Sequence, residues 1–428
     1  MKKIALLFLF FLSISSFSSA QEIRVLTIKD YIINPIIEEY IKESLKEAER
    51  TSCCLIIRLN TPGGLLKSTQ NIVKEILNAK IPVITYIWPK GARAASAGTF
   101  IGYASSILAM APSTHIGAAH PVLGGGSWGK LPSELKEKIM NDTLAWAKNI
   151  AKEKKRPYKF LEDAIKESKS LTEEEAKRLG IIDFVAKNID ELLKKIEGEK
   201  LKINGQDTIL SLKNPSLKFI ELNLRQKFLN TILEPNIAYL LFTLGFLGLI
   251  FEFTHPGFGF PGIGGIICII LALYAFSILP VNYAGLALII LGLIFFIVEA
   301  FTPTFGVFSL AGIISFILGS VLLFREPSTF KVSLKIITPL GLAILAWSIF
   351  IFGKVIQIRL KKPKTGKEAL IGERGQALTD ISNKGKVFIH GEIWQAKSKE
   401  EIKKGEEVEV VKIKGLTLEV KRKEAEDV

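Results

Sequence analysis

Five apolar stretches of roughly twenty residues lie close together in the second half of the chain. We place them near residues 236–254, 262–280, 283–301, 305–324 and 336–357. A helix needs about 20 apolar residues to cross a bilayer, and turn-forming pairs such as Pro256-Gly257 separate the stretches. The sequence therefore predicts a transmembrane region of five helices over residues 236–357, surrounded by the lipid bilayer, and excludes a wholly soluble protein.

The first four stretches contain an internal repeat. Glu252, Pro256, Phe258, Gly259 and Gly265 match, at one constant offset, Glu299, Pro303, Phe305, Gly306 and Gly312. We therefore expect two copies of one helical hairpin. The carboxylates at 252 and 299 lie near span ends. We interpret them as interfacial groups in contact with water, with a proton or ion site as the alternative.

The N-terminus predicts export. Residues 1–20 combine two lysines, an apolar run and small residues before Ala20, as a secretory signal peptide does; an uncleaved anchor is the alternative. An exported start followed by five crossings places the C-terminus in the cytoplasm. The basic cluster Lys354–Lys364 after the last span agrees, although the basic loop Arg325–Lys335 then lies outside. We expect a multi-pass protein of the cell (inner) membrane.

Neither charge nor metal-binding side chains indicate a cofactor. The formal net charge of +14 would suit a nucleic-acid-binding protein, but basic flanks of membrane spans are the interpretation that we prefer. The four histidines are scattered, and the three cysteines show neither metal-ligand spacing nor a disulfide framework. We expect no metal, no other cofactor and no nucleic-acid partner.

Strand-like and helix-like stretches alternate over residues 21–200. Ile23–Ile28 alternates with period two, Asn34 and Pro35 begin a helix that runs to about Arg50, and Leu55–Leu59 is typical of a buried strand. This rhythm predicts an α/β domain with mainly parallel strands. A linker over 201–235 follows. Short runs separated by glycines over 368–428 predict a small all-β barrel.

Two glycine-rich turns follow predicted strands of the α/β domain. Thr61-Pro62-Gly63-Gly64 leads into a helix, and its glycines leave backbone N–H groups accessible to an oxyanion. Ser96 lies among small residues between Gly91 and Thr99, close to the positive end of the next helix. Each turn alone has an ordinary structural explanation, a tight turn or a helix cap. Together they favour nucleophilic catalysis by a serine.

The chain resembles the NfeD family of membrane-bound serine proteases, whose peptidase domain has the ClpP-type fold related to the crotonase superfamily. Four segments carry the resemblance: Asn60–Gly64, Gly91–Phe100, Ile116–Pro121 and Gly391–Ala396. It covers nearly all of the mature chain. It implies a ClpP/crotonase-like α/β peptidase domain, a membrane region and a C-terminal barrel of the oligonucleotide/oligosaccharide-binding (OB) fold.

The resemblance implies a Ser-Lys dyad. Ser96 would be the nucleophile, and the backbone N–H groups of Gly64 and Ala97 would form the oxyanion hole. Counting back along the helix expected from about Ser133 to Ala151 assigns the lysine to Lys138.

Two other side chains compete for the role of base. Lys136 borders the same apolar stripe of the helix as Lys138, so the helical pattern does not separate them. Whichever lysine acts has to be neutral near pH 7, and burial has to lower its pKa from about 10.4. His120 is the alternative base, because the segment from His120 to Gly125 is similar to the region where a ClpP-type triad places its histidine.

The predicted function is ATP-independent serine endopeptidase activity. The resemblance implies a stomatin-like membrane protein as partner, hydrophobic peptide segments as substrates, and a homodimer or larger homo-oligomer. One alternative is a non-catalytic membrane scaffold that organises the stomatin-like partner, and another is a Ser-His peptidase. An acyl-CoA enzyme on the crotonase fold is disfavoured, because an exported domain meets little CoA.

Overall fold

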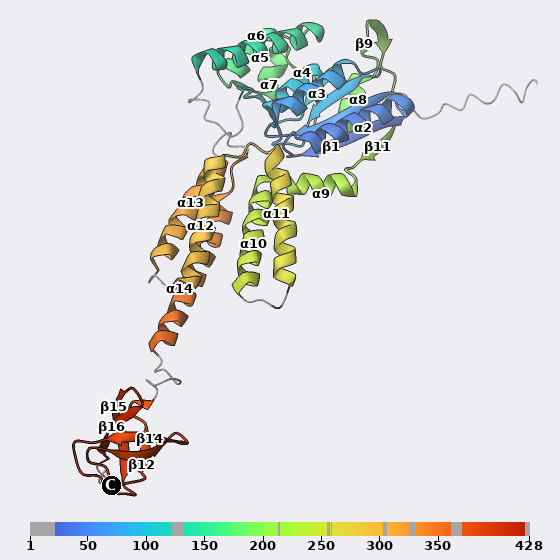
Figure 1. Ribbon diagram of the computed structural model, residues 1–428. Coiled ribbons are helices and arrows are strands. Elements are labelled where there is room, and N and C mark those ends of the chain that lie inside the picture. The colour runs from blue at the N-terminus through green and yellow to red at the C-terminus, as the bar shows by residue number, and fades with distance from the viewer. Residues whose placement is uncertain are drawn as a thin grey trace, which may run out of the picture. The chain divides into compact units, whose positions relative to one another are not determined.

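The computed structural model describes residues 22–121, 132–212, 215–254, 257, 259–302, 306–324, 330–360 and 370–423 (Figure 1). The predicted signal peptide, the loop at 123–131 and the turn prolines at 256 and 303 lie outside these residues. The chain divides into two units: Met1–Thr302 with Val307–Ile344, and Pro303–Gly306 with Leu345–Val428.

A six-stranded parallel sheet forms the centre of the α/β domain. Its strand order is β11-β1-β2-β3-β5-β8, with the bounds Ser216–Ile220, Glu22–Lys29, Cys54–Asn60, Val83–Ile87, Ile107–Met110 and Phe184–Val185. The central strands are buried on both faces, as in other parallel sheets. The predicted mainly parallel α/β domain is confirmed.

Helices cover both faces of this sheet. Leu55 and Ile57 of β2 pack into the core under α2–α6, whereas Cys54 and Ile56 pack into a second core under α8. The helices are α2 (Pro35–Thr51), α3 (Leu66–Leu77), α4 (Ala97–Ala104), α5 (Ser133–Glu153), α6 (Tyr158–Lys166), α7 (Glu173–Arg178) and α8 (Ile189–Ile196). A small sheet, β4 (Arg93–Ala95), β6 (His115–Gly117) and β7 (Ser170–Thr172), lies beside α4.

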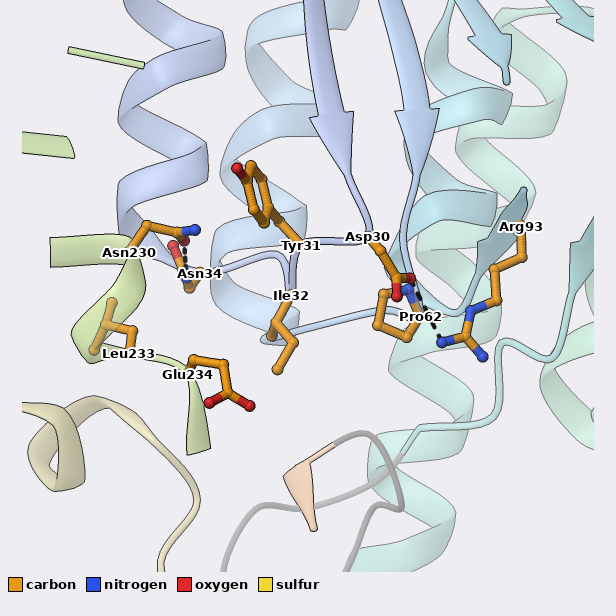
Figure 2. Close-up of a pocket in the computed structure, with 9 residues that line it drawn as sticks. All are labelled: Asp30, Tyr31, Ile32, Asn34, Pro62, Arg93, Asn230, Leu233 and Glu234. Atoms are coloured by element: carbon orange, nitrogen blue, oxygen red, sulfur yellow. Dashed lines mark hydrogen bonds and ion pairs between the residues drawn. The ribbon is translucent and has the colours of Figure 1, made fainter. Parts of the chain in front are cut away.

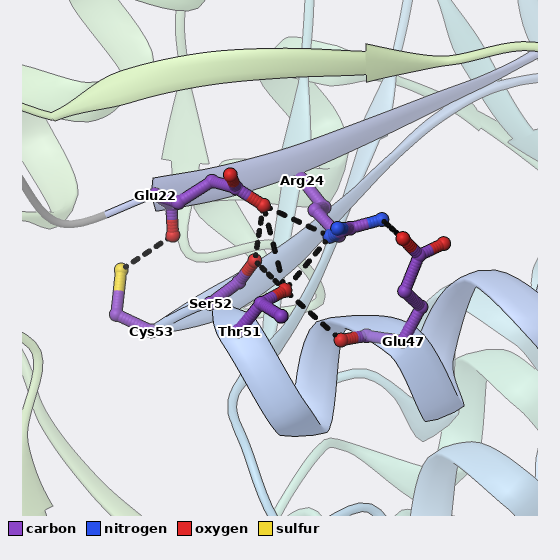
Figure 3. A network of polar contacts seen from close by, with 6 residues as sticks. All are labelled: Glu22, Arg24, Glu47, Thr51, Ser52 and Cys53. Carbon is purple, nitrogen blue, oxygen red and sulfur yellow. Dashed lines mark hydrogen bonds and ion pairs between the residues drawn. The ribbon is translucent and has the colours of Figure 1, made fainter.

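The buried guanidinium of Arg24 joins the start of β1 to the end of α2 (Figure 3). Its Nε donates to Glu22 Oε1 at 3.0 Å and to Thr51 Oγ1 at 3.1 Å, and Nη1 pairs with Glu47 at 2.6 Å. Ser52 donates to the same Glu22 oxygen. A buried charge is tolerated when it is paired and hydrogen-bonded, so this network fixes α2 against the sheet.

The segment predicted as a linker also contributes to the fold. β9 (Lys200–Ile203) and β10 (Gln206–Ile209) form a hairpin, and β11 joins the main sheet beside β1. Helix α9 (Leu224–Ile232) follows and packs on α2, where Gln226 Nε2 donates to Glu43 at 2.9 Å. The connection to the membrane region is therefore an ordered part of the α/β domain.

The five predicted membrane helices are present. They are α10 (Pro235–Thr254), α11 (Phe260–Ile278), α12 (Tyr283–Phe301), α13 (Val307–Leu323) and α14 (Leu334–Leu360). Among the described residues, Pro235–Phe253 and Phe260–Ile278 are long and apolar enough to cross a membrane, and the other three helices contain shorter apolar stretches.

The internal repeat is confirmed as two matching helical hairpins. In the first, a β-carbon at Gly265 would lie 2.6 Å from the carbonyl oxygen of Gly245. In the second, a β-carbon at Gly312 would lie 3.0 Å from the carbonyl oxygen of Gly292. Glycine is needed at these positions because the two helix backbones approach so closely.

The two repeated carboxylates have the same structural role in both hairpins. Glu252 accepts a hydrogen bond from the backbone N–H of Gly259 at 3.1 Å. Glu299 accepts from the N–H groups of Phe308 and Ser309 at 3.1 and 3.2 Å. Each carboxylate thus satisfies N–H groups at the start of the next helix, a role that the repeat in the sequence did not indicate.

The second unit contains a closed five-stranded barrel, as predicted. Its strand order is β12-β13-β14-β16-β15, with the bounds Arg374–Ala377, Gly385–Ile389, Glu392–Lys397, Thr417–Arg422 and Glu407–Lys414. Alternate side chains, such as Val387 and Ile389 of β13, fill its interior.

Candidate active site

Ser96 lies between β4 and α4 in a strained backbone conformation. Its φ is 51° and its ψ is −110°, outside the regions that residues with a β-carbon normally occupy. The surroundings hold it there: Ser96 N–H donates to the Gly117 carbonyl at 2.9 Å, and the Thr99 hydroxyl donates to that same oxygen at 2.8 Å. The side chain is half-buried at the start of the helix.

The Thr61–Gly64 turn packs directly against Ser96. A β-carbon at Gly63, where φ is 123°, would lie 2.8 Å from Ser96 Cβ and 3.3 Å from its Oγ. At Gly64 a β-carbon would lie 2.1 Å from the backbone of Ile33. The buried Thr61 hydroxyl donates to the Tyr31 carbonyl at 2.7 Å and stabilises the turn. Only glycine fits at either position, so the two glycine-rich segments form one structure.

Two backbone N–H groups beside the serine are available. Those of Gly64 and Ala97 donate to no acceptor among the described residues. Ala97 is the first residue of α4, and the first N–H groups of a helix have no partner within it. Unpaired N–H groups at a helix start favour a negatively charged oxygen.

His120 is held by α6. Its Nδ1 lies 2.8 Å from the carbonyl oxygen of Ile165. Since a carbonyl oxygen only accepts, Nδ1 carries the proton and donates it to Ile165. The ring therefore has a fixed orientation.

Lys138 lies on the exposed N-terminal half of α5. The predicted apolar stripe is buried only further along, where Thr143 and Ile150 enter the core; Leu135 is 41% exposed. The Lys138 side chain makes no hydrogen bond or ion pair with the residues that the structure describes. Within the described residues of a single chain, Lys138 therefore lacks the buried, apolar environment that we expected around its amine. Lys136 is half-buried.

Burial lowers the pKa of a different lysine, Lys154, at the end of α5. Its neighbour Arg156 contacts the carbonyl oxygen of Ser105 and pairs with Asp183 at 2.8 Å. Ser105 follows the last residue of α4, whereas Ser96 precedes the first. Lys154 therefore lies near the end of α4 remote from Ser96, and we do not assign it to the site.

A polar pocket of about 320 Å³ opens beside the two glycine-rich segments (Figure 2). Pro62 and Arg93 line it from these two segments, and Arg93 pairs with Asp30 at 3.6 Å. The opposite wall comes from the end of α9 and the residues after it, Asn230, Leu233 and Glu234. This pocket could not be predicted from the sequence, because no local pattern indicates that residues 230–234 return to residues 30–34.

Three family models match the chain. The NfeD1b N-terminal domain matches residues 22–206, the NfeD integral membrane domain residues 236–354, and the NfeD-like C-terminal, partner-binding domain residues 367–422. Membrane-bound protease PH1510 of Pyrococcus horikoshii is 43% identical over 384 residues, which are 87% of this chain and 87% of the relative. The chain belongs to the NfeD family. It is an integral membrane protein and a homologue of a membrane-bound protease.

Two further comparisons extend this relationship. Membrane protein NfeD1b of Bacillus subtilis is 26% identical over 411 residues, covering 89% of each chain. A solved structure of a 1510-N membrane-bound stomatin-specific protease, a lysine-to-alanine variant in complex with a substrate peptide, is 37% identical. It covers 50% of this chain and 98% of that chain, with a TM-score of 0.47.

Proposed function

We propose that this NfeD-family protein is a serine endopeptidase in which Ser96 is the nucleophile, Lys138 is the general base, and the N–H groups of Gly64 and Ala97 form the oxyanion hole. The observation that carries the proposal is the arrangement at Ser96. A half-buried serine at a helix start packs against a glycine turn, and two N–H groups beside it lack a partner among the described residues.

The chemistry follows from these groups. Lys138, in its neutral form, takes the hydroxyl proton while Ser96 Oγ attacks the peptide carbonyl. The two N–H groups stabilise the negative charge on the carbonyl oxygen as the tetrahedral intermediate forms. The protonated amine then gives its proton to the leaving nitrogen, and an acyl-enzyme remains on Ser96. Water releases the acyl group by the same steps.

The exposure of Lys138 makes this proposal depend on a second surface. Because an exposed amine stays protonated at pH 7, another element has to cover the start of α5 when the site works. We propose a second copy of the chain for this role, so that the working enzyme is a homodimer or larger assembly. The half-buried Ile139 and Met140 on the same segment supply apolar contact area for it.

We further propose that the substrates are hydrophobic segments of a stomatin-like membrane protein. The support is the 43% identity to PH1510 together with the description of the 1510-N structure as a stomatin-specific protease. In this proposal residues 21–200 form an exported peptidase domain, and the barrel at 368–428 lies in the cytoplasm.

A hydrophobic peptide library tests the proposal. The full chain in detergent is incubated with the library without ATP, and the products are identified by mass spectrometry. We expect cleavage by the unsubstituted protein and none by a folded Ser96→Ala variant. Cleavage that persists in Ser96→Ala would reject the nucleophile, and an inactive protein with an intact stomatin-like interaction would favour the scaffold.

A further inference from the structure

Helix α9 has an exposed apolar face that takes no part in the proposed catalysis. Leu224 is 87% exposed and Phe228 is 56% exposed. These two residues are one helical turn apart and therefore share a face. The opposite face is buried: Gln226 is 2% exposed, and Leu233, directly after the helix, is 1% exposed. The helix is fully formed, because Asn223 and Gln226 make a reciprocal capping box at its start.

The buried face of α9 is fixed to the α/β domain at several points. Besides Gln226, Asn230 Oδ1 accepts a hydrogen bond from Asn34 at 2.8 Å, and Arg225 pairs with Glu39 at 2.7 Å. Ile36 of α2 shares a core with Leu233. The apolar face with Leu224 and Phe228 is therefore held pointing away from α2, and the chain cannot bury it by rotating the helix.

The membrane domain begins immediately after α9. Glu234 accepts a hydrogen bond from Ile237 N–H at 2.9 Å and caps α10, whose first residue is Pro235. Figure 1 shows α9 lying crosswise beside α11 and near the start of α10, close to the ends of these helices that face the α/β domain. Tyr283, at the start of α12, is 79% exposed, as is typical of an aromatic residue at the membrane–water boundary. This places α9 at that boundary.

We infer that α9 is an interfacial helix whose Leu224 and Phe228 insert into the outer boundary of the bilayer's acyl region. Such helices present apolar side chains to lipid while their other face stays polar. Here the polar face is bound to the peptidase domain. The helix therefore holds that domain at a fixed height above the lipid.

The charges around α9 indicate which lipids it needs. Arg225 pairs with Glu39, and Lys227 pairs with Glu221 at 2.8 Å. Since both basic side chains already have carboxylate partners, they offer little free positive charge to anionic headgroups. Insertion should depend on apolar contact and proceed equally in zwitterionic and anionic bilayers.

A consequence for substrate capture rests on the proposed function. The end of α9 forms one wall of the pocket whose other wall is Pro62 and Arg93, beside Ser96. If α9 lies in the bilayer surface, this pocket opens close to the lipid headgroups. A substrate segment leaving the membrane would then reach the catalytic turns without crossing bulk water.

Tryptophan scanning of the full chain in bilayers tests the insertion. Leu224→Trp and Phe228→Trp are reconstituted in phosphatidylcholine nanodiscs with and without lipids brominated near the carbonyl end of the acyl chain. Ile209→Trp is the matched control, because Ile209 is also an exposed apolar residue, at 63%, in the β9–β10 hairpin on the side of the domain remote from α10 (Figure 1). The spectrum of the unsubstituted protein is subtracted to remove its five native tryptophans.

We expect brominated lipid to quench the added fluorescence at positions 224 and 228 by about twofold or more, and to leave position 209 unchanged. Adding phosphatidylglycerol should not alter this result. Equal, weak quenching at all three positions would overturn the inference. Protection from aqueous iodide without quenching by lipid would also overturn it, because that pattern shows a protein partner such as a second copy.

A double substitution, Leu224→Glu with Phe228→Glu, separates this inference from the proposed function. We expect cleavage of a bilayer-embedded substrate to fall about tenfold, while cleavage of a water-soluble peptide stays unchanged. Equal loss on both substrates would reject the link between α9 and substrate capture. If the unsubstituted protein cleaves neither substrate, the proposed function fails, whereas the quenching result still decides whether α9 inserts.

Discussion

A β-carbon on Gly63 would lie 2.8 Å from the β-carbon of Ser96, closer than two carbon atoms can approach without displacement. The glycine turn and the strained serine are therefore packed as one unit, although the 32 residues Gly64–Ala95 lie between Gly63 and Ser96 in the sequence. The turn also carries the Gly64 N–H that faces no acceptor among the described residues. Any side chain at position 63 has to displace Ser96.

Gly63→Ala should reduce peptide hydrolysis by about 100-fold or more, because a misplaced nucleophile loses its alignment with the carbonyl. Gly91→Ala is the matched control. Gly91 also has a positive φ, of 83°, but nothing lies within 4 Å of its β-carbon position. Both variants carry a backbone strain of roughly 1–3 kcal/mol, and the contact with Ser96 is the additional feature at position 63. Equal activity of the two variants would contradict the packing argument.

Lys138→Ala should abolish hydrolysis, whereas His120→Ala and Lys136→Ala should retain at least about a tenth of it. The reason is that Lys138 is the proposed base that takes the Ser96 proton, and neither His120 nor Lys136 has a chemical role in the proposal. Initial rates on one peptide, measured with all three folded variants, decide this. Loss of activity in the histidine variant alone would assign the base to His120.

At alkaline pH the hydrogen bond that joins α2 to the segment before α9 should be lost. Burial raises the pKa of Tyr40 to about 12, and its hydroxyl donates to the Ile220 carbonyl at 2.7 Å. A pKa raised above its unfolded value of about 10 stabilises the fold fully below pH 10, and this contribution is lost as the pH rises through 12.

The matched variant for that titration is Tyr40→Phe. At pH 7 we expect its unfolding temperature to be roughly 2–4 °C lower, because one buried hydrogen bond is lost. The difference from the unsubstituted protein should shrink between pH 10 and 12. A constant difference across this range, measured by circular dichroism, would show that the Tyr40 hydroxyl ionises without penalty.

Gly265→Ala should destabilise the first membrane hairpin by about 1–3 kcal/mol, because the new β-carbon meets the Gly245 carbonyl oxygen at 2.6 Å. Gly264→Ala, one residue earlier in the same helix, places its β-carbon in open space and should be neutral or stabilising. Unfolding in detergent measures both. Equal stability of the two variants would contradict the close approach of α10 and α11.

Much of this fold could be predicted from local patterns. Period-two alternation in β1, the Asn34-Pro35 helix start and the apolar stretches of α10–α14 depend on residues that are close in sequence. Asn34 caps α2 as expected, accepting from Ile36 and Ile37 N–H groups at 2.9 and 3.0 Å. The serine turn was predictable for the same reason, since small residues and a helix start are local features.

Features that depend on distant contacts could not be predicted in this way. The stripe from Leu135 to Ile150 has helical periodicity, but periodicity does not show whether a neighbour covers each turn. Only the second half of α5 is covered, where Trp146 stacks on Phe100 with ring centroids 4.6 Å apart. In the same way, nothing within Ser216–Ile220 indicates that it pairs with β1.

The central claim, that Ser96 forms an acyl-enzyme, is tested most directly by locating a covalent adduct. The full chain is treated with an active-site serine reagent, digested, and analysed by mass spectrometry alongside Ser96→Ala. We predict one adduct on the peptide that contains Ser96, with loss of hydrolysis in proportion to labelling. Full labelling of another residue, with the Ser96 peptide unmodified and hydrolysis lost, would contradict the account.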